Sequence, residues 1–362
     1  MAAKRNRTSI PTLPIFWLLA VLRACVAVVF EGHTNLQAND SSTRIAMGSC
    51  ANQKFKQPIW EAIVATQPDG FVFLGDNVYA DTEDMGEMRN AYRALGEKEG
   101  YQALLNTCPV YAIWDDHDYG VNDGGAEFPM REGAEEVFHE FFQTPEDSDS
   151  RRRPGIYDVD YVMASGGQML QLIRLDTRYF RGPLVKLPKR GLHGPYDRNL
   201  DRSATILGAD QWAWLAKVFG EPADLRVIAT SIQFLPQDHQ WERWENFPHE
   251  RQKLLDLLKE KETGPVIFLS GDRHMGEIMK LRPDDPASPG FPIYEITSSG
   301  LTNAGGGQPG EPNRHRVSPT NFQSRNFGLV TVDWDSSLVE LELRNVTGGV
   351  VDTFRVDLRA TE

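Results

Sequence analysis

The chain has 362 residues, of which 40% are hydrophobic and 25% are charged, the proportions of a soluble globular protein. A chain of this length forms either two average domains or one large α/β domain, and it can bury a sizeable core. The formal net charge of -13 argues against a protein built to coat nucleic acid.

The amino-terminal segment differs from the rest of the chain. Lys4, Arg5 and Arg7 precede an apolar run over residues 10–30, which is the arrangement of a secretory signal peptide. Arg23 interrupts this run, so the uninterrupted apolar stretch is short for a membrane span. We therefore predict that the protein is secreted by a cleaved signal, with a membrane anchor as the alternative.

This interpretation sets the predicted domain organisation. Residues 1–30 form the signal peptide or anchor, residues 31–43 form a linker, and residues 44–362 form one domain. An uncleaved amino-terminal segment would be the only contact with a membrane. No pattern in the sequence indicates a nucleic-acid or protein partner.

Helices and strands alternate in the first part of this domain. We predict strands over residues 44–50, 71–74 and 110–114, with helices over residues 54–67 and 83–106 between them. The order β-α-β-α-β favours a parallel sheet whose loops gather at the carboxyl ends of the strands.

An acidic cluster follows the third of these strands. Asp115, Asp116 and Asp118 place three carboxylates beside the imidazole of His117, and such groups repel one another unless positive charge is present. We interpret the cluster as a candidate metal site. A solvated acidic turn is the alternative, because Asp, Asn and Gly are ordinary turn residues.

The rest of the domain continues with both kinds of element. We predict a helix over residues 131–143, hairpin strands over 155–163 and 168–175, strands over 226–230, 265–270 and 293–297, and closing antiparallel strands over 328–356.

A long basic loop is predicted over residues 181–206. Its Lys186, Lys189, Arg190 and His193 either attract an anionic substrate or are merely solvated. Loops of this length within a domain are usually functional or disordered.

The cysteine content leaves two interpretations open. Cys25 lies in the predicted signal, so Cys50 and Cys108 remain as a pair that an oxidising compartment would allow to bridge. The other interpretation is that Cys50, which directly follows a strand, is a thiolate ligand of a metal.

The ends of the predicted strands supply a mixed set of metal ligands. They carry the 115–118 cluster together with Cys50, Asp76, Tyr79, Asp272 and His274. In an open α/β sheet the site forms outside the carboxyl ends of the strands. Alternate positions such as Asp272 and His274 face the same way, so both side chains can reach one site. The set suits two metals that share a bridging carboxylate and support in-line displacement at phosphorus.

At these residues the chain resembles the PhoD-like alkaline phosphatases of the calcineurin-like metallophosphatase superfamily. The resemblance covers about residues 44–330 and is carried by five ordered motifs: Gly48-Ser49-Cys50, Gly75-Asp76-Asn77-Val78-Tyr79, Trp114-Asp115-Asp116-His117-Asp118, Gly271-Asp272-Arg273-His274 and Thr297-Ser298-Ser299-Gly300. It implies an α/β fold of the metallophosphatase type, a four-layer sandwich in which two mixed β-sheets pack together and are flanked by helices. It also implies hydrolysis of phosphate esters at a binuclear or multinuclear centre of Fe³⁺ with Ca²⁺ or another divalent ion.

The resemblance further implies roles for individual residues. Cys50 and Tyr79 would bind the ferric ion, with Asp76 as the bridging carboxylate. Asp272 and His274 stand where the superfamily commonly has Gly-His-x-His, which makes both candidate ligands. Asp116 and His117 match the usual Asn-His pair, so Asp116 is a candidate ligand and His117 a candidate proton donor.

The chain departs from the family pattern in two places. The expected asparagine does not follow the acidic cluster at the usual spacing, and Asn122 takes its place as a candidate ligand. The histidine expected after a later strand is replaced by Gln233, a weaker ligand.

Two arginines complete the predicted site. Arg178 and Arg273 follow strands and would neutralise phosphate oxygens, a contact that suits the guanidinium group. For Arg178 a structural salt bridge is the alternative.

The predicted function is that of a secreted metallophosphoesterase. Metal-activated hydroxide would attack phosphorus, and His117 would assist departure of the alcohol. One alternative is a phosphodiesterase or phospholipase-like activity of the same site. Another is a catalytically silent, metal-stabilised binding protein that retains the scaffold.

Overall fold

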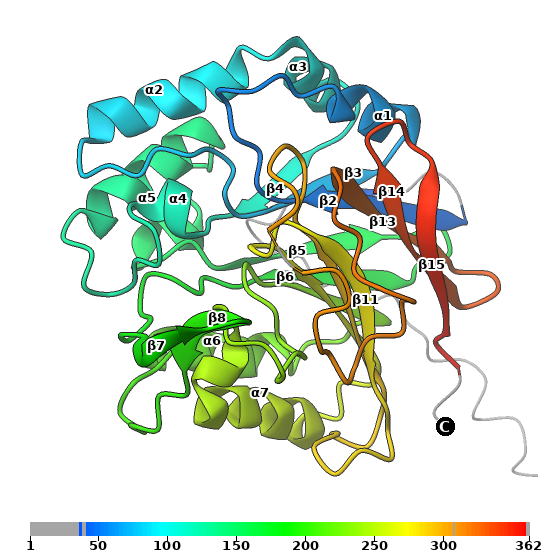
Figure 1. The fold of residues 1–362 in the computed structure, drawn as a ribbon. Helices are drawn as coiled ribbons and strands as arrows, with labels where there is room; N and C mark the ends of the chain where they lie inside the picture. The colour runs from blue at the N-terminus through cyan, green and yellow to red at the C-terminus, as the bar shows by residue number, and fades with distance from the viewer. Residues whose placement is uncertain (1–35, 38–40, 307, 360–362) are drawn as a thin grey trace, which may run out of the picture. The chain divides into compact units, whose positions relative to one another are not determined.

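The computed structural model describes residues 36–37, 41–306 and 308–359 (Figure 1). The predicted signal peptide or anchor, Cys25 and most of the predicted linker lie outside the described residues. Within the described ranges, the protein contains no helix that is both long enough and apolar enough to cross a lipid bilayer.

Among the described residues, six strands form one mixed sheet in the order β15-β14-β13-β2-β3-β4. They are β2 (Ser42–Gly48), β3 (Gly70–Leu74), β4 (Val110–Ile113), β13 (Asn326–Asp333), β14 (Leu338–Asn345) and β15 (Val350–Asp357). The strands β2, β3 and β4 are parallel, as predicted, and the closing strands continue antiparallel beyond β2. Every residue of β3 is buried, because this sheet is covered on both faces.

Seven further strands of the described chain form a second mixed sheet, in the order β1-β5-β6-β9-β10-β12-β11. They are β1 (Leu36–Gln37), β5 (Asp158–Met163), β6 (Met169–Arg174), β9 (Leu225–Ala229), β10 (Val266–Ser270), β11 (Gly276–Leu281) and β12 (Ile293–Ser298). β5 and β6 form the predicted hairpin, and β6, β9, β10 and β12 are parallel neighbours. The edge strand β11 pairs antiparallel with β12 and was missed by the sequence prediction.

The prediction of a continuous loop over residues 181–206 is wrong for part of that range. Residues Val185–Gly191 and Gly194–Asp197 form the antiparallel strands β7 and β8. Pro188 lies inside β7. Proline cannot donate a ladder hydrogen bond and is confined to edges and irregular pairs, so its presence argued against a strand in this range.

The helices flank the two sheets. They are α1 (Ile59–Ala65), α2 (Met85–Gly96), α3 (Glu99–Leu105), α4 (Asp116–Tyr119), α5 (Arg131–Phe141), α6 (Gly208–Val218) and α7 (Pro248–Glu260), with short 3₁₀ turns at Asp149–Arg152 and Trp244–Asn246. The first helix begins after Pro58, five residues later than predicted, because proline favours helix starts. The range predicted as one helix over 83–106 is divided into α2 and α3.

The arrangement is the predicted four-layer α/β sandwich. Helices α1, α2 and α3 lie on one side of the sheets, whereas α6 and α7 lie on the other (Figure 1). Apolar side chains from both sheets form one buried core, which includes Ile45 and Phe73 of the first sheet and Leu172 and Ile267 of the second.

Strand ends from the two sheets meet at one edge of this sandwich. The backbone N–H of Ser49, after β2, donates to the carbonyl oxygen of Ser298 at the end of β12, at 3.1 Å. Two glycines permit the close approach: a Cβ atom at Gly75 would lie 2.4 Å from Cβ of Asp115, and one at Gly271 would lie 2.6 Å from Oγ of Ser49. The predicted ligands all follow strands that end at this edge.

Candidate metal centre

Four of the predicted ligands have a left-handed backbone conformation. Their φ angles are 62° at Cys50, 51° at Asp76, 66° at Asp272 and 53° at His274. This conformation costs a non-glycine residue about 1–3 kcal/mol, and such residues cluster where the surrounding fold holds a functional site in place. Each of the four comes shortly after a strand, so the turned backbone keeps its side chain at the strand end.

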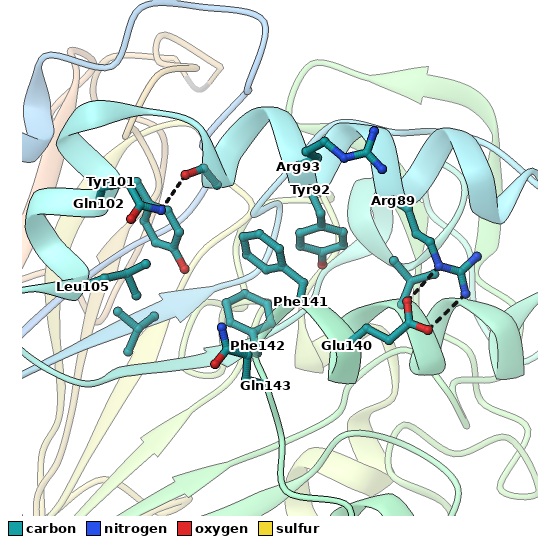
Figure 2. Close-up of a pocket in the computed structure, with 13 residues that line it drawn as sticks. Arg89, Tyr92, Arg93, Tyr101, Gln102, Leu105, Glu140, Phe141, Phe142 and Gln143 are labelled. Atoms are coloured by element: carbon teal, nitrogen blue, oxygen red, sulfur yellow. Dashed lines mark hydrogen bonds and ion pairs between the residues drawn. The ribbon is translucent and has the colours of Figure 1, made fainter.

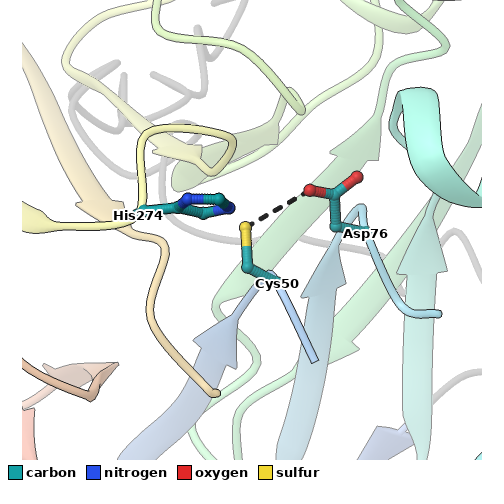
Figure 3. A group of neighbouring side chains, drawn as sticks. All are labelled: Cys50, Asp76 and His274. Atoms are coloured by element: carbon teal, nitrogen blue, oxygen red, sulfur yellow. Dashed lines mark hydrogen bonds between the residues drawn. The ribbon is translucent and has the colours of Figure 1, made fainter. Parts of the chain in front are cut away.

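One group of ligands surrounds the thiol of Cys50. Ligand atoms of Cys50, Asp76 and His274 all lie within 4.8 Å of one another, and the three side chains point toward a common centre (Figure 3). The hydroxyl of Tyr79 completes the group, at 3.0 Å from Oδ2 of Asp76 and 3.1 Å from Nε2 of His274. Thiol, carboxylate, imidazole and phenol are therefore gathered at one buried point.

A second group lies beside the first and shares a member with it. Asp76 also lies within 4.8 Å of ligand atoms of Asp116 and His117, and Asp116 in turn lies within that distance of Asp115 and Asp272. Shared carboxylates of this kind allow one residue to contact two adjacent cations.

An unpaired oxygen marks the second group as a place for a cation. Oδ1 of Asp115 accepts hydrogen bonds from Ser231 and Arg178, whereas the buried Oδ2 has no hydrogen-bond partner. A buried carboxylate oxygen without a partner is costly, and a metal ion beside Asp116 and Asp272 would satisfy it.

The pKa values show that the side chains of both ligand groups tolerate negative charge poorly when no cation is present. Burial raises the pKa of the Cys50 thiol to about 11, and burial together with the Asp116 carboxylate raises the pKa of Asp272 to about 7. Burial and the neighbouring Cys50 also raise the pKa of Asp76. Metal ions bind the deprotonated forms of such groups and supply the missing positive charge. The donor set thus fits a metal centre.

Cys50 and Cys108 are both free thiols and both buried. The thiol of Cys50 instead lies 3.4 Å from Oδ2 of Asp76 and 3.1 Å from Oγ of Ser299. The structure therefore places Cys50 among the candidate ligands and not in a disulfide.

His117 lies at the edge of the second group with its ring held from two sides. Nδ1 lies 2.7 Å from a carboxylate oxygen of Asp81, and the ring stacks on that of Tyr79 with centroids 4.3 Å apart. Burial opposes protonation of this imidazole, but Asp81 and Asp116 outweigh it and raise the pKa of His117 to about 10. The neighbouring carboxylates therefore favour the protonated form of this ring, which can donate a proton.

A cavity of about 180 Å³ lies over both groups. Its lining consists of Asp76, Asp116, His117, Asn122, Asp123, Pro195, Tyr196, Trp241, Glu242, Asp272, Arg273, His274 and Gly306. Asn122 is exposed, and its side-chain amide donates to Oδ2 of Asp123 at 2.6 Å.

The two predicted phosphate-binding arginines have different surroundings. Arg273 lines the cavity, with its guanidinium paired to Glu311 at 2.8 Å and donating to Gln233 at 3.1 Å. Arg178 is fully buried behind the centre, where it pairs with Asp115 and with Glu242. This environment is that of the structural salt bridge, the alternative stated for Arg178.

Gln233 also departs from its predicted place as a substitute ligand. Its carbonyl oxygen accepts from Arg273, and its amide donates to Glu277 and Thr297, both at 2.8 Å. The carbonyl oxygen of Gln233 thus holds Arg273, and Glu277 and Thr297 fix its amide end.

The family follows from the extent of the sequence match. The pattern that defines the family described as PhoD-like phosphatase matches residues 45–343 of this chain. The chain belongs to the PhoD-like phosphatase family.

A curated relative and solved structures agree with this family. Alkaline phosphatase D of Bacillus subtilis (strain 168) is 23% identical over 257 residues, which cover 63% of this chain and 42% of the relative. The matched region therefore spans less than half of that relative's length.

Two solved structures show the same fold. The structure described as that of PhoD has a TM-score of 0.73 at 17% identity and covers 90% of this chain and 71% of its own. A dimetal phosphatase from Danio rerio has a TM-score of 0.51 at 12% identity, covering 87% of this chain and 99% of its own. At these identities the likeness concerns the fold, and it confirms the predicted metallophosphatase-type sandwich.

This PhoD-like chain also gives supporting roles to residues for which the sequence analysis predicted no individual role. Asp118 accepts hydrogen bonds from the backbone N–H groups of Asp76, Asn77 and Asp115, and from the hydroxyl of Tyr92. It therefore ties the loops after β3 and β4 together. Its place in the acidic cluster was visible in the sequence, but its partners were not.

Three further residues around the centre had no predicted role: Ser299, Asp81 and Glu242. Oγ of Ser299 accepts from the backbone N–H of His274 at 2.7 Å, and Glu242 pairs with both Arg178 and Arg181. Asp81 follows the Gly75–Tyr79 motif by two residues, and this position is a usable signal. Glu242 carries no such signal, because only the fold brings it to the centre.

A larger cavity of the PhoD-like chain lies away from the ligands. It measures about 550 Å³ and is lined by residues of α2, α3 and α5, among them Tyr92, Tyr101 and Phe141 (Figure 2). None of the candidate metal ligands lines it, so size alone does not locate the site of chemistry.

Removal of the buried arginine is expected to destabilise the fold. In Arg178→Met, Asp115 loses its counter-charge and Glu242 keeps only its pair with Arg181, and breaking a buried ion pair in this way costs about 3–5 kcal/mol. Urea unfolding measures the change. The matched control is Arg89→Met, which removes the exposed pair with Glu140 and is expected to cost less than about 1 kcal/mol. Equal stability of the two variants would contradict the role of Arg178.

Proposed function

We propose that the chain is a metal-dependent phosphoesterase that hydrolyses phosphate mono- or diesters. The observation that carries this proposal is the overlap of the ligand groups, which share Asp76 and Asp116 and lie beside His117 at one cavity. Family membership supports the same reaction class.

The assignment of ligands follows their chemistry. Cys50, Tyr79 and His274 with Asp76 would hold Fe³⁺, whose site includes the sulfur and phenol donors. Asp76, Asp116 and Asp272, with Asn122 at the cavity edge, would hold Ca²⁺ or another divalent ion through oxygen. When bound, two such ions supply a water-derived nucleophile at neutral pH and neutralise charge on the phosphoryl oxygens.

The side chains of the cavity would carry the remaining steps. His117 is oriented by Asp81 and would give its proton to the oxygen of the leaving alcohol. Arg273, held by Gln233 and Glu311, would contact a phosphoryl oxygen from the cavity wall. Arg178 would act at a distance, by holding the Asp115 carboxylate toward Asp116 and Asp272.

The test is chelator-sensitive turnover of two substrates. Purified full-length protein is assayed with an aryl phosphate and a bis-aryl phosphate, before and after treatment with a chelator and after return of metal ions. We expect hydrolysis of at least one ester, its loss on chelation and its recovery on reconstitution. The preferred ester separates phosphatase from phosphodiesterase or phospholipase-like activity. Metal-replete protein that hydrolyses neither ester would instead be the silent, metal-stabilised binding protein.

Replacement of Cys50 is expected to change metal content. Cys50→Ala removes the sulfur donor beside Asp76 and His274, so the purified variant should lose iron while keeping its fold. The matched control is Cys108→Ala, since Cys108 is also buried but lies outside the ligand groups. Elemental analysis measures both. Unchanged iron content in the Cys50 variant would defeat its assignment as a ligand.

The location and domain division form part of this proposal. We propose that residues 1–30 direct secretion or anchor the protein, that residues 31–43 link this segment to the domain, and that residues 44–362 act as one catalytic unit. Microsequencing of the protein released by the producing cell tests whether cleavage occurs near residue 30.

A further inference from the structure

We propose that Arg190 and Trp241 form a subsite for a second anionic group of the substrate, a carboxylate or a phosphate carried by the leaving group. The choice of phosphorus-containing ligands rests on the proposed function. The subsite lies at the rim of the cavity over the candidate metal centre.

The cavity is too small to enclose a sizeable leaving group, so part of such a substrate would lie against residues outside it. Its volume is about 180 Å³, whereas pockets that enclose a drug-sized ligand measure about 300–1,000 Å³. A phosphoryl group fits inside such a space, but a sizeable leaving group extends over the rim. The residues of the rim therefore decide which leaving groups bind.

The charges of the cavity wall do not favour a second anion within it. Five acidic side chains line the cavity: Asp76, Asp116, Asp123, Glu242 and Asp272. Arg273, the only arginine among the described residues of the lining, is already paired with Glu311 at 2.8 Å, and both side chains are almost fully buried. A second anionic group of the substrate thus needs a cation from outside the lining.

Arg190 is placed to supply that charge. It lies on β7, is exposed, and its guanidinium carbon lies 4.9 Å from the centroid of the Trp241 ring, which itself lines the cavity. Among the described residues, no carboxylate pairs with Arg190. A guanidinium over an indole ring is held in place while its N–H groups stay available to a carboxylate or phosphate.

The surrounding structure holds both residues of the subsite. The hairpin that carries Arg190 is fastened by the N–H of Tyr196, which donates to the carbonyl oxygen of Gln240 at 2.9 Å, and by the N–H of Gln240, which donates to His193 at 2.6 Å. The Trp241 ring also lies 5.7 Å from the guanidinium carbon of Arg273. Trp241 therefore links the cavity wall to Arg190.

The test measures binding with a matched pair of non-hydrolysable ligands. (4-Carboxybenzyl)phosphonate and (4-carbamoylbenzyl)phosphonate differ only in the second anionic group. Their dissociation constants are measured by calorimetry with metal-containing, full-length protein. We expect the carboxylate to bind about five- to tenfold more tightly, as for an ion pair at a partly exposed site. In Arg190→Gln this preference should fall to about one, and in Arg190→Lys it should be partly retained.

The control is Lys189→Gln, which removes the neighbouring hairpin charge and should keep the preference. The proposal is overturned if the unmodified protein shows no preference, if Arg190→Gln retains it, or if Lys189→Gln loses it equally. Turnover of 4-nitrophenyl phosphate and of bis(4-nitrophenyl) phosphate in the same samples reports separately on the proposed function. An Arg190-dependent preference without turnover would refute the enzyme and support the subsite, whereas turnover without the preference would refute the subsite alone.

Discussion

Replacement of Asp76 by asparagine is expected to lower kcat by at least about 10²–10³-fold, the cost of removing one preorganised electrostatic contact, and to lower metal content as well. Asp76 is the residue shared by the Cys50 group and the His117 group, so its loss affects both candidate cations. Asparagine is nearly isosteric and tolerates the left-handed backbone at this position, where φ is 51°. The loss should therefore reflect charge and not misfolding.

A matched substitution separates the site from general effects of removing an aspartate. Asp84→Asn replaces the residue that caps α2 through hydrogen bonds to Gly86 and Glu87, and asparagine caps helices about as well as aspartate. Steady-state kinetics and elemental analysis on both variants measure the outcome. Full activity with full metal content in Asp76→Asn would rule out Asp76 as the bridging ligand.

Replacement of His117 by glutamine is expected to lower kcat by about 10²–10⁴-fold for an ester with a poor leaving group. The ring of His117 is held by Asp81 at 2.7 Å, and its proposed role is to protonate the departing oxygen. An ester with a good leaving group needs that proton less. The loss should accordingly be smaller for 4-nitrophenyl phosphate than for phenyl phosphate.

Metal analysis decides between two roles for His117, because it also lies within 4.8 Å of ligand atoms of Asp76 and Asp116. Unchanged metal content with a leaving-group-dependent loss supports proton donation. A fall in metal content with an equal loss for both esters would show that His117 is a ligand. His249→Gln is the control, since His249 contacts the carbonyl oxygen of Ala204 away from the centre.

Local patterns predicted most of the fold. Continuous apolar runs identified β3, β4 and β10, and the alternation of these runs with helices correctly predicted a parallel arrangement in the first sheet. The hairpin of β7 and β8 was not predicted, because Pro188 and the glycines of the turn interrupt the pattern of its strands. The helix start at Ile59 was also missed, since boundaries depend on local capping more than on periodicity.

Local sequence patterns likewise predicted some residues of the candidate site and not others. Cys50, Asp76, Asp272 and His274 were recognisable because each closely follows a strand, and the fold gathers strand ends at one edge. The environment of Arg178 was not predictable, because its partner Glu242 is 64 residues away and both are buried only in the assembled sandwich. The unpartnered oxygen of Asp115 likewise exists only once Arg178 and Ser231 occupy the other oxygen. Roles assigned to the individual ligands stay predictions.

Anomalous diffraction from crystals of the purified protein, recorded at the iron edge and away from it, locates the metal ions and identifies iron among them. We expect two neighbouring metal peaks, with the iron peak among Cys50, Asp76, Tyr79 and His274 and the second among Asp76, Asp116 and Asp272. No metal peak at these residues, in protein that still hydrolyses phosphate esters, would contradict this assignment.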